Sequence, residues 1–324
     1  MKNAILFVTV LAVWSLLAWS QEDQTPAKLL AAVREQSDIF NHAPHPFLLQ
    51  ADLTAQLAAP VQGRLTIHWQ SKNHWRRELE LGLYKEIVVR VGEWEYAKRN
   101  MGFAPIRASD AVLLLEFAKP NDHIAAKSTK THNSGGVALT CISLQSTVNN
   151  ERYKMCVDPA AHEILTYDPW PYGLSGGAAA FSGYVGIEEM QFPKHLELRE
   201  AGQGATVTVN VTKLEDQAFD ANLLTPPPGA TERRYCEVMS PPFMIQKPDI
   251  ASLGQFSQDV HVRFQVTVLT DGSVGAIQVI GQSSAEAADR IRKVWMHARY
   301  KPAMCGTEPV VADEQDGLDI RPNQ

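Results

Sequence analysis

One serine stands in a pattern that could support nucleophilic catalysis. Ser175 lies at the centre of residues 173–177, which match G-x-S-x-G. A nucleophile elbow of this kind needs a strand before it and a helix after it, because a strained turn must present the hydroxyl group. Prolines precede this pattern, and a run of glycine and alanine follows it. We therefore interpret the stretch as a loop and expect no catalytic residue and no enzyme activity. A serine hydrolase that uses Ser175 is the least favoured alternative.

Two histidines have the spacing of metal ligands. His42 and His45 are three residues apart, which would place them on one face of a helix. Pro44 and Pro46 would break a helix at this point. We therefore interpret both histidines as loop residues, and we expect no metal site and no cofactor.

A pair of arginines beside a tryptophan offers a contact for an anion. Arg76 and Arg77 follow Trp75 and could bind a lipid phosphate. The alternative, which we favour, is an exposed strand edge on which one arginine packs against the indole ring.

The four cysteines predict two disulfides. Their number is even, and they follow an apparent export signal, which favours disulfides over metal binding. Cys141 and Cys156 are 15 residues apart and suit a staple across a hairpin. Cys236 and Cys305 remain, and by elimination they form the second pair.

The beginning of the chain resembles an export signal. Lys2 is followed by an apolar run from Ala4 to Trp19, and Ala18-Trp19-Ser20 gives the run a small-x-small end. This pattern is typical of a secretory signal peptide, and we expect cleavage after Ser20. An uncleaved membrane anchor is the alternative, because the run is near the lower length limit for a membrane span. The mature chain is then expected to be soluble and periplasmic or secreted, with no further integral membrane span.

Composition limits the classes of function. The chain has 324 residues, of which 45% are hydrophobic, so it can bury a large core and has room for two domains. The formal net charge is −6, and no block of lysine or arginine is dense enough to follow a phosphate backbone. Nucleic acid is therefore not an expected partner.

Alternating apolar residues predict a β-rich region after an N-terminal helix. Residues 26–40 have an apolar stripe at helical spacing behind Thr25, which can cap the helix, and residues 108–117 are a second predicted helix. Residues 47–57 alternate strictly, and several further strands follow up to residue 213. Residues 226–229 contain three prolines and a glycine, so they mark the predicted domain boundary.

A set of large apolar side chains on these strands forms the candidate ligand site. Either they are the core of a sandwich or half-barrel, or they line a cavity for an acyl chain, and the sequence leaves both readings open because each needs apolar inward faces. The set consists of Phe47, Leu49, Trp69, Trp75, Trp94 and Tyr96.

The order of these strands resembles the LolA-like fold of lipoprotein carriers. The resemblance rests on ADLTAQ, GRLTIHWQS and EWEYAKRN early in the region, and on QFPKHLELRE and an Asp-x-x-Leu-x-x-Pro-Pro closure later in it. It extends over about residues 25–229. It implies an incomplete barrel that helices close over an apolar cavity, with an acyl or lipid ligand.

The last ninety residues or so are similar to the TonB C-terminal family. An Asp271-Gly272 hairpin signal is followed by a helix over residues 287–298, with Ser283 and Glu286 at capping-box spacing. Lys301-Pro302-Ala303 and a Gly-x-x-Pro-Val-Val strand come next. The family resemblance implies docking of a protein partner along a sheet edge, here formed by Glu308, Val310 and Val311. That family usually has a membrane anchor followed by a long Pro-rich spacer, whereas this chain has a carrier-like domain before the C-terminal region. The Tyr-Pro element before the first strand is also missing, so energy transduction is not expected.

These observations predict an α+β protein with two domains after a signal peptide at 1–20. Residues 21–229 are expected to form an antiparallel half-barrel with covering helices, and residues 230–324 a small two-layer αβ domain like that of TonB. We expect a non-enzymatic periplasmic protein that binds an apolar or lipid ligand in its first domain and an envelope protein through its second. A structural or adaptor protein with no small ligand is the alternative.

Overall fold

The structure is a computed structural model that describes most of the chain. The described residues are 25–56, 59–101, 104–120, 122–134, 137–147, 150–168, 177–200, 204–236, 239–256, 260–280 and 284–320. The predicted signal peptide, the alternative membrane anchor and Ser175 lie outside these ranges. Within them, no helix is long and apolar enough to cross a membrane.

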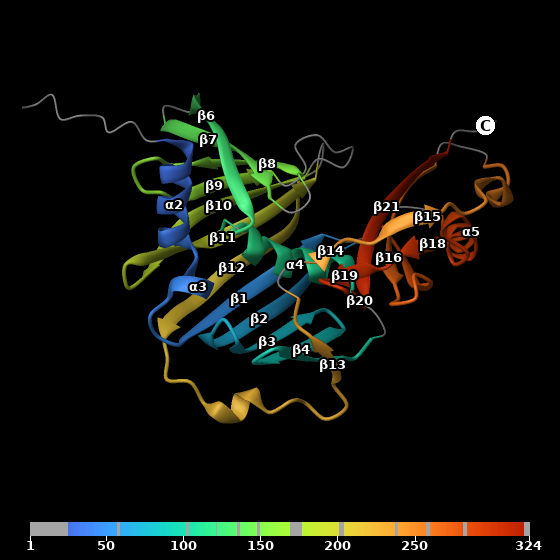
Figure 1. Ribbon diagram of the computed structural model, residues 1–324, viewed down its shortest axis with the longest axis horizontal. Helices are drawn as coiled ribbons and strands as arrows, with labels where there is room; N and C mark the ends of the chain where they lie inside the picture. The colour runs from blue at the N-terminus through green and yellow to red at the C-terminus, as the bar shows by residue number, and fades with distance from the viewer. Residues whose placement is uncertain are drawn as a thin grey trace, which may run out of the picture.

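An antiparallel sheet of thirteen strands dominates the molecule (Figure 1). The strand order is β13-β5-β4-β3-β2-β1-β12-β11-β10-β9-β8-β7-β6, so β1 and β12 pair in the middle and join the two halves. The strands are β1 Phe47–Gln56, β2 Pro60–Ser71, β3 His74–Leu81, β4 Tyr84–Val91, β5 Trp94–Arg99, β6 Ile124–Ser134, β7 Val137–Ser146, β8 Arg152–Val157, β9 Ile164–Asp168, β10 Gly177–Ile187, β11 Met190–Glu200, β12 Ala205–Asp216 and β13 Thr231–Arg234.

Tight turns hold the strands that carry the candidate site. Two-residue connections join β3 to β4 and β4 to β5, and each begins with a glycine at positive φ, Gly82 at 57° and Gly92 at 61°. Short hairpin turns require positive φ, which glycine adopts without steric cost. These turns fix the register, and therefore which side chains of β3, β4 and β5 share a face.

Three helices cover one face of the sheet. They are α2 Pro26–Ser37, α3 Ile39–His42 and α4 Ile106–Phe117. Thr25 caps α2 by accepting a hydrogen bond from the Lys28 amide, and α4 confirms the helix predicted over 108–117. In Figure 1, α2 crosses the half of the sheet that contains β6–β12, and α4 lies near β1 and β12. The main hydrophobic core fills the space between these helices and the inward faces of the strands.

Beyond β13, the described residues form three small sheets, one 3₁₀ helix and one α-helix. The predicted Asp271-Gly272 hairpin is confirmed, since β16 and β17 are antiparallel neighbours around it. Phe264 packs edge-on against Trp295 at 4.6 Å between ring centroids in a second, smaller core. The elements are η1 Ala221–Leu224, which precedes β13, and then β14 Met239–Ser240, β15 Phe243–Gln246, η2 Ile250–Leu253, β16 Val260–Val268, β17 Val274–Ile280, α5 Ala285–Trp295, β18 Arg299–Lys301, β19 Ala303–Cys305, β20 Glu308–Val310 and β21 Ala312–Ile320.

The cap of α5 differs from the predicted one. The N-cap is Ser284, and its hydroxyl oxygen accepts a hydrogen bond from the Ala287 amide at 3.1 Å. Ser283, the predicted cap, lies outside the described residues. The two serines are adjacent, and either can accept a bond from an amide of the first turn. Spacing alone therefore could not separate them.

The predicted fold class was wrong. The structure has a large open sheet of thirteen strands rather than an α+β half-barrel, and residues 239–320 form several short sheets rather than a TonB-like two-layer αβ domain. Period-two patterning identifies strands one at a time but does not specify how many share a sheet or whether the sheet closes. Residues 124–146, which form β6 and β7, extend the sheet where no strand was predicted before Cys141.

Both predicted disulfides are confirmed. Cys141 on β7 and Cys156 on β8 are directly opposite each other in the register and form one disulfide. Cys236 follows β13 and forms the other with Cys305 on β19. The second disulfide links the edge of the large sheet to the smaller sheets. The predicted boundary at 229 stays a prediction, and β13 pairs with β5 just beyond it.

Candidate ligand-binding cavity

A straight row of facing residues crosses six strands of the large sheet. Each residue is the register partner of the next, so the side chains stand side by side on the face that the helices cover. The row begins with aromatic residues and ends with charged ones. Its members are Phe47 on β1, Trp69 on β2, Trp75 on β3, Arg90 on β4, Glu95 on β5 and Arg233 on β13.

The aromatic end of the row is a layered stack. The rings of Trp69 and Trp75 are nearly parallel, with centroids 6.5 Å apart. Phe47 stacks on the other side of Trp69 at 5.9 Å, and Phe40 from α3 meets Trp69 edge-on at 5.3 Å. Stacked and edge-on pairs at these separations are favourable beyond the area they bury. The stack therefore forms a rigid apolar wall.

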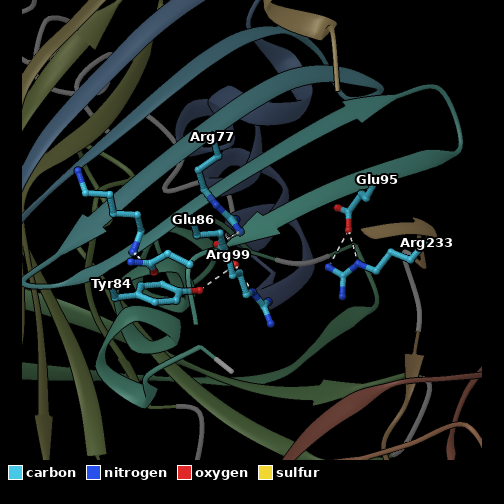
Figure 2. Close-up of polar contacts among 8 residues, drawn as sticks. Arg77, Tyr84, Glu86, Glu95, Arg99 and Arg233 are labelled. Atoms are coloured by element: carbon cyan, nitrogen blue, oxygen red, sulfur yellow. Dashed lines mark hydrogen bonds and ion pairs between the residues drawn. The ribbon is translucent and has the colours of Figure 1, made fainter. Parts of the chain in front are cut away.

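Next to the row, a buried carboxylate lies between two arginines, as Figure 2 shows. The Glu86 carboxylate accepts hydrogen bonds from Arg99 at 2.7 Å and Arg77 at 3.2 Å, and from the Tyr84 hydroxyl group at 3.1 Å. Burial opposes ionisation of Glu86, but the two guanidinium groups outweigh it and lower its pKa. Burial of the Tyr84 hydroxyl group and the charge of the nearby Glu86 raise the pKa of Tyr84. Glu86 is therefore ionised at neutral pH and Tyr84 is a hydrogen-bond donor.

A second ion pair lies further along the row. Both Nε and Nη2 of Arg233 contact Oε2 of Glu95, at 2.8 Å and 2.7 Å (Figure 2). The Glu95 side chain is buried, whereas Arg233 is more than half exposed. Arg233 thus compensates the buried charge of Glu95 from the edge of the sheet.

The helices contribute one more charged group on the opposite wall. The Lys119 ammonium group lies 3.4 Å from Glu116 and 3.8 Å from the buried Asp38, and it approaches the Phe40 ring to 5.5 Å. Burial lowers the pKa of Lys119, but the carboxylates of Glu116 and Asp38 outweigh this and raise it. The lysine is therefore charged at neutral pH.

A cavity of about 580 Å³ lies between these walls. Trp69, Trp75, Arg77, Arg90, Glu95, Lys119 and Arg233 all line it, together with Val112, Leu113 and Phe117 from α4 and Tyr235 after β13. A smaller cavity of about 200 Å³ shares Arg77, Val112, Leu113 and Glu116 with it and extends to Glu86 and Arg99. The main volume lies within the range of about 300–1,000 Å³ that is usual for small-molecule sites. The strand wall of the cavity is aromatic at Trp69 and Trp75 and charged at the end with Arg90, Glu95 and Arg233. On the opposite wall, Lys119 adds a charge beside Phe40.

The structure separates the six predicted ligand residues into three groups. Trp69 and Trp75 line the cavity. Phe47 and Leu49 are fully buried in the core behind that wall. Trp94 and Tyr96 flank the inward-facing Glu95 on β5, so the alternation of the strand places them on the opposite face, and Trp94 is 43% exposed.

Apart from Arg77, sequence reasoning missed the charged residues that line the two cavities. Glu86 and Arg90 alternate with Ile87 and Val89 in the run EIVVRV, which reads as a plain apolar strand. Both lie on the same face as Tyr84, which is buried. The available signal was that these charged residues occupy inward positions of a strand. Burial of an unpaired charge is costly, so charges at such positions indicate partners elsewhere in the chain.

The two adjacent arginines point to opposite faces of β3. Arg77 lines the cavity, and its guanidinium group lies 5.8 Å from the Trp75 ring, which agrees with the predicted packing of one arginine on the indole. The predicted exposed strand edge was wrong, because β3 lies between β2 and β4 in the sheet. Arg76 contacts Glu78 at 2.6 Å and the carbonyl oxygen of Leu223 in η1 at 3.4 Å.

The predicted partner-binding residues lie on a sheet edge. Glu308 and Val310 are the ends of β20, the outer strand of the sheet β14-β19-β20, and Val311 follows it with 48% exposure. Pro309 stands between them and has no amide hydrogen to offer. Arg234 approaches Glu308 to 3.6 Å.

Of the two histidines predicted to lie in a loop, His45 follows α3, whereas His42 is the last residue of α3, so the prediction was wrong for His42. His45 lies 3.4 Å from Glu188. Among the described residues, no group of three or more histidine, cysteine or acidic side chains has the arrangement of a metal site.

Comparison with known proteins gives structural similarity alone. No family model and no curated protein matches the sequence. Among solved structures, a LolA-superfamily protein from Nitrosomonas europaea is 10% identical, with a TM-score of 0.44 over 60% of this chain and 97% of that one. A DUF1329 family protein from Desulfovibrio piger is 12% identical, with a TM-score of 0.44 over 61% of this chain and 96% of that one. The MucA/MucB complex of Pseudomonas aeruginosa gives 11% identity and a TM-score of 0.29 over 89% and 99% of the two chains.

Proposed function

We propose that this protein is a non-enzymatic binding protein that holds the apolar part of a lipid-like molecule in the 580 Å³ cavity. The observation that carries the proposal is the division of the strand wall of the cavity into an aromatic part, which includes Trp69 and Trp75, and a charged end. Apolar surface of a ligand gains free energy when it leaves water, and a few fixed polar groups give orientation. An amphiphilic molecule matches both ends.

We also propose that the protein works in an oxidising compartment, the periplasm or the cell exterior. The two disulfides support this location, because disulfides persist in exported proteins and are rare in the cytosol. The signal-like residues 1–20 point in the same direction.

Filling the cavity tests the binding proposal. Val112 on α4 lines both cavities, and Val112→Trp would place an indole where the ligand lies. We expect the affinity for dodecanoate, measured by isothermal titration calorimetry, to fall about tenfold or more, which is about 1.4 kcal/mol. Leu83→Trp is the matched control, because Leu83 is 84% exposed in the β3–β4 turn. Equal affinity of the two variants, or no binding by the parent protein, would contradict the proposal.

A partner protein is the second part of the proposed function. Met239, Phe243, Ile245 and Ile250 are large apolar residues in one short segment after β13, and each is more than 40% exposed. Clustered exposed apolar side chains mark protein-binding surfaces. A photo-crosslinking amino acid in place of Phe243 is expected to give a discrete adduct with an envelope protein in cells, whereas one in place of Leu83 gives none. Identical crosslinking at both positions would count against this docking surface.

A further inference from the structure

Arg90 differs from Arg77, Lys119 and Arg233, three other cations that line the cavity. It is 6% exposed, and all its partners are neutral. Its Nε donates to the carbonyl oxygen of Gly92 at 3.2 Å, its Nη2 donates to Asn73 at 3.0 Å, and its guanidinium group lies 3.2 Å from the centroid of the Tyr235 ring. Arginine has five N–H donors, and the bonds to Gly92 and Asn73 use two of them. Among the described residues, no carboxylate lies within ion-pair distance of Arg90.

Each of these three cations is paired with a carboxylate. Arg77 contacts Glu86, Arg233 contacts Glu95, and Lys119 contacts Glu116 and Asp38. Burial of a charge is costly unless an opposite charge accompanies it. Arg90 therefore carries a buried positive charge that an incoming anion would compensate.

The carboxylate that could neutralise Arg90 is held elsewhere. Glu95 is the register partner of Arg90, and opposite charges at such positions normally interact. Its Oε2 atom is instead engaged by two nitrogens of Arg233 on the edge strand β13 (Figure 2). Arg233 thus keeps Glu95 from closing the space beside Arg90.

We infer that Arg90 binds the anionic head group of the ligand and that Arg233 positions Glu95 so that this site stays open. The inference rests on the proposed function and names its ligand class: an acyl chain that carries a carboxylate or phosphate group. Trp75, the other register partner of Arg90, places the apolar wall directly beside the guanidinium group. Arginine suits this task because its planar fork can donate two parallel bonds to one carboxylate or phosphate.

Three ligands with the same tail test the head-group assignment. We expect dodecanoate and dodecyl phosphate to bind the parent protein about tenfold to a hundredfold more tightly than dodecanol, as measured by calorimetry. Arg90→Gln should reduce this preference to near unity, and Arg90→Lys should retain part of it. Equal affinity for the three ligands in the parent protein, or an unchanged preference in Arg90→Gln, would overturn the inference.

A second pair of variants leaves Arg90 in place. Arg233→Gln should release Glu95 to pair with Arg90 and reduce dodecanoate binding about tenfold, with little effect on dodecanol. Adding Glu95→Gln to this variant should restore binding, because the competing carboxylate is gone. Arg234→Gln is the control on the same strand, since Arg234 contacts Glu93 and Glu308 outside the cavity. Failure of the double variant to recover dodecanoate binding would overturn the positioning role of Arg233.

The outcomes separate this inference from the proposed function. Binding of all three ligands without a head-group preference would leave the proposed function standing and reject Arg90 as the anion site. Binding of none of them would reject the proposed function, and the inference with it. Competition with dodecanoate by inorganic phosphate, with no contribution from the tail, would assign the site to a free anion and overturn the acyl-ligand form.

Discussion

Glu86→Gln is expected to lower the free energy of unfolding by about 3 kcal/mol, which is the lower end of the cost of breaking a buried ion pair by removing one partner. The carboxylate of Glu86 is 6% exposed and compensates both Arg77 and Arg99. A neutral amide cannot do so, and the two guanidinium groups would then face each other without the charge between them. Urea unfolding followed by circular dichroism measures the change.

The matched control is an exposed pair on the same two strands. Glu80 on β3 lies 2.7 Å from Lys85 on β4, and both side chains are more than half exposed. Exposed pairs contribute about 0–1 kcal/mol, so Glu80→Gln should change stability little. Equal losses in the two variants would contradict the assigned role of Glu86.

The same carboxylate predicts a dependence on pH. Arg77 and Arg99 lower the pKa of Glu86 in the folded state against the effect of burial. A carboxyl group with a lowered folded-state pKa contributes stability above its unfolded-state pKa, about 4.3, and loses it as the pH falls through the folded-state value. The stability difference between the parent and Glu86→Gln should therefore be constant near pH 7 and shrink below about pH 4. A difference that grows on acidification would show that the folded-state pKa is raised instead.

Local patterns predicted the elements well because each depends on neighbouring residues. The helix over 108–117, the Asp271-Gly272 hairpin and the two disulfides all follow from local spacing or from pairing within a small set, and the structure confirms them. Trp69 and Trp75 were also placed in the predicted ligand site, and they line the cavity. These predictions came from the spacing of apolar residues, the turn residues and the number of cysteines.

Features that depend on distant strands could not be predicted in this way. The fold class was wrong because alternation does not show that β6–β9 join the same sheet as β1–β5. The charged end of the cavity needs Arg233 to stand opposite Glu95, although 138 residues separate them in the chain. Trp94 and Tyr96 seemed to belong to an inward set, but the register places Glu95 inward instead. The pairing and register of the strands decide which side chains face inward and which residues stand opposite each other. A single sequence does not specify that register.

The charged row also explains why β13 matters to a cavity formed mainly by earlier strands. Arg233 and Tyr235 come from the segment 231–236 and contact Glu95 and Arg90, respectively. Cys236 ends this segment and forms the disulfide with Cys305. The smaller sheets are thus covalently attached next to the charged end of the cavity, so a change in their position would act directly on Tyr235.

Removal of this disulfide is expected to produce the largest loss of stability. Cys236→Ser with Cys305→Ser opens a cross-link with a sequence separation of 69, and the chain-entropy model assigns such a loop about 4 kcal/mol. The matched comparison is Cys141→Ser with Cys156→Ser, which opens a separation of 15 worth about 3 kcal/mol in the same model. Urea unfolding should therefore give a lower free energy of unfolding for the Cys236/Cys305 double variant than for the Cys141/Cys156 double variant.

The same two variants differ in their expected effect on ligand release. Since Tyr235 adjoins Cys236, the Cys236/Cys305 variant should release dodecanoate faster in stopped-flow measurements, while the Cys141/Cys156 variant should not. The reverse ranking, with equal release rates, would show that the segment 231–236 is held by Arg233 and β5 without help from the disulfide.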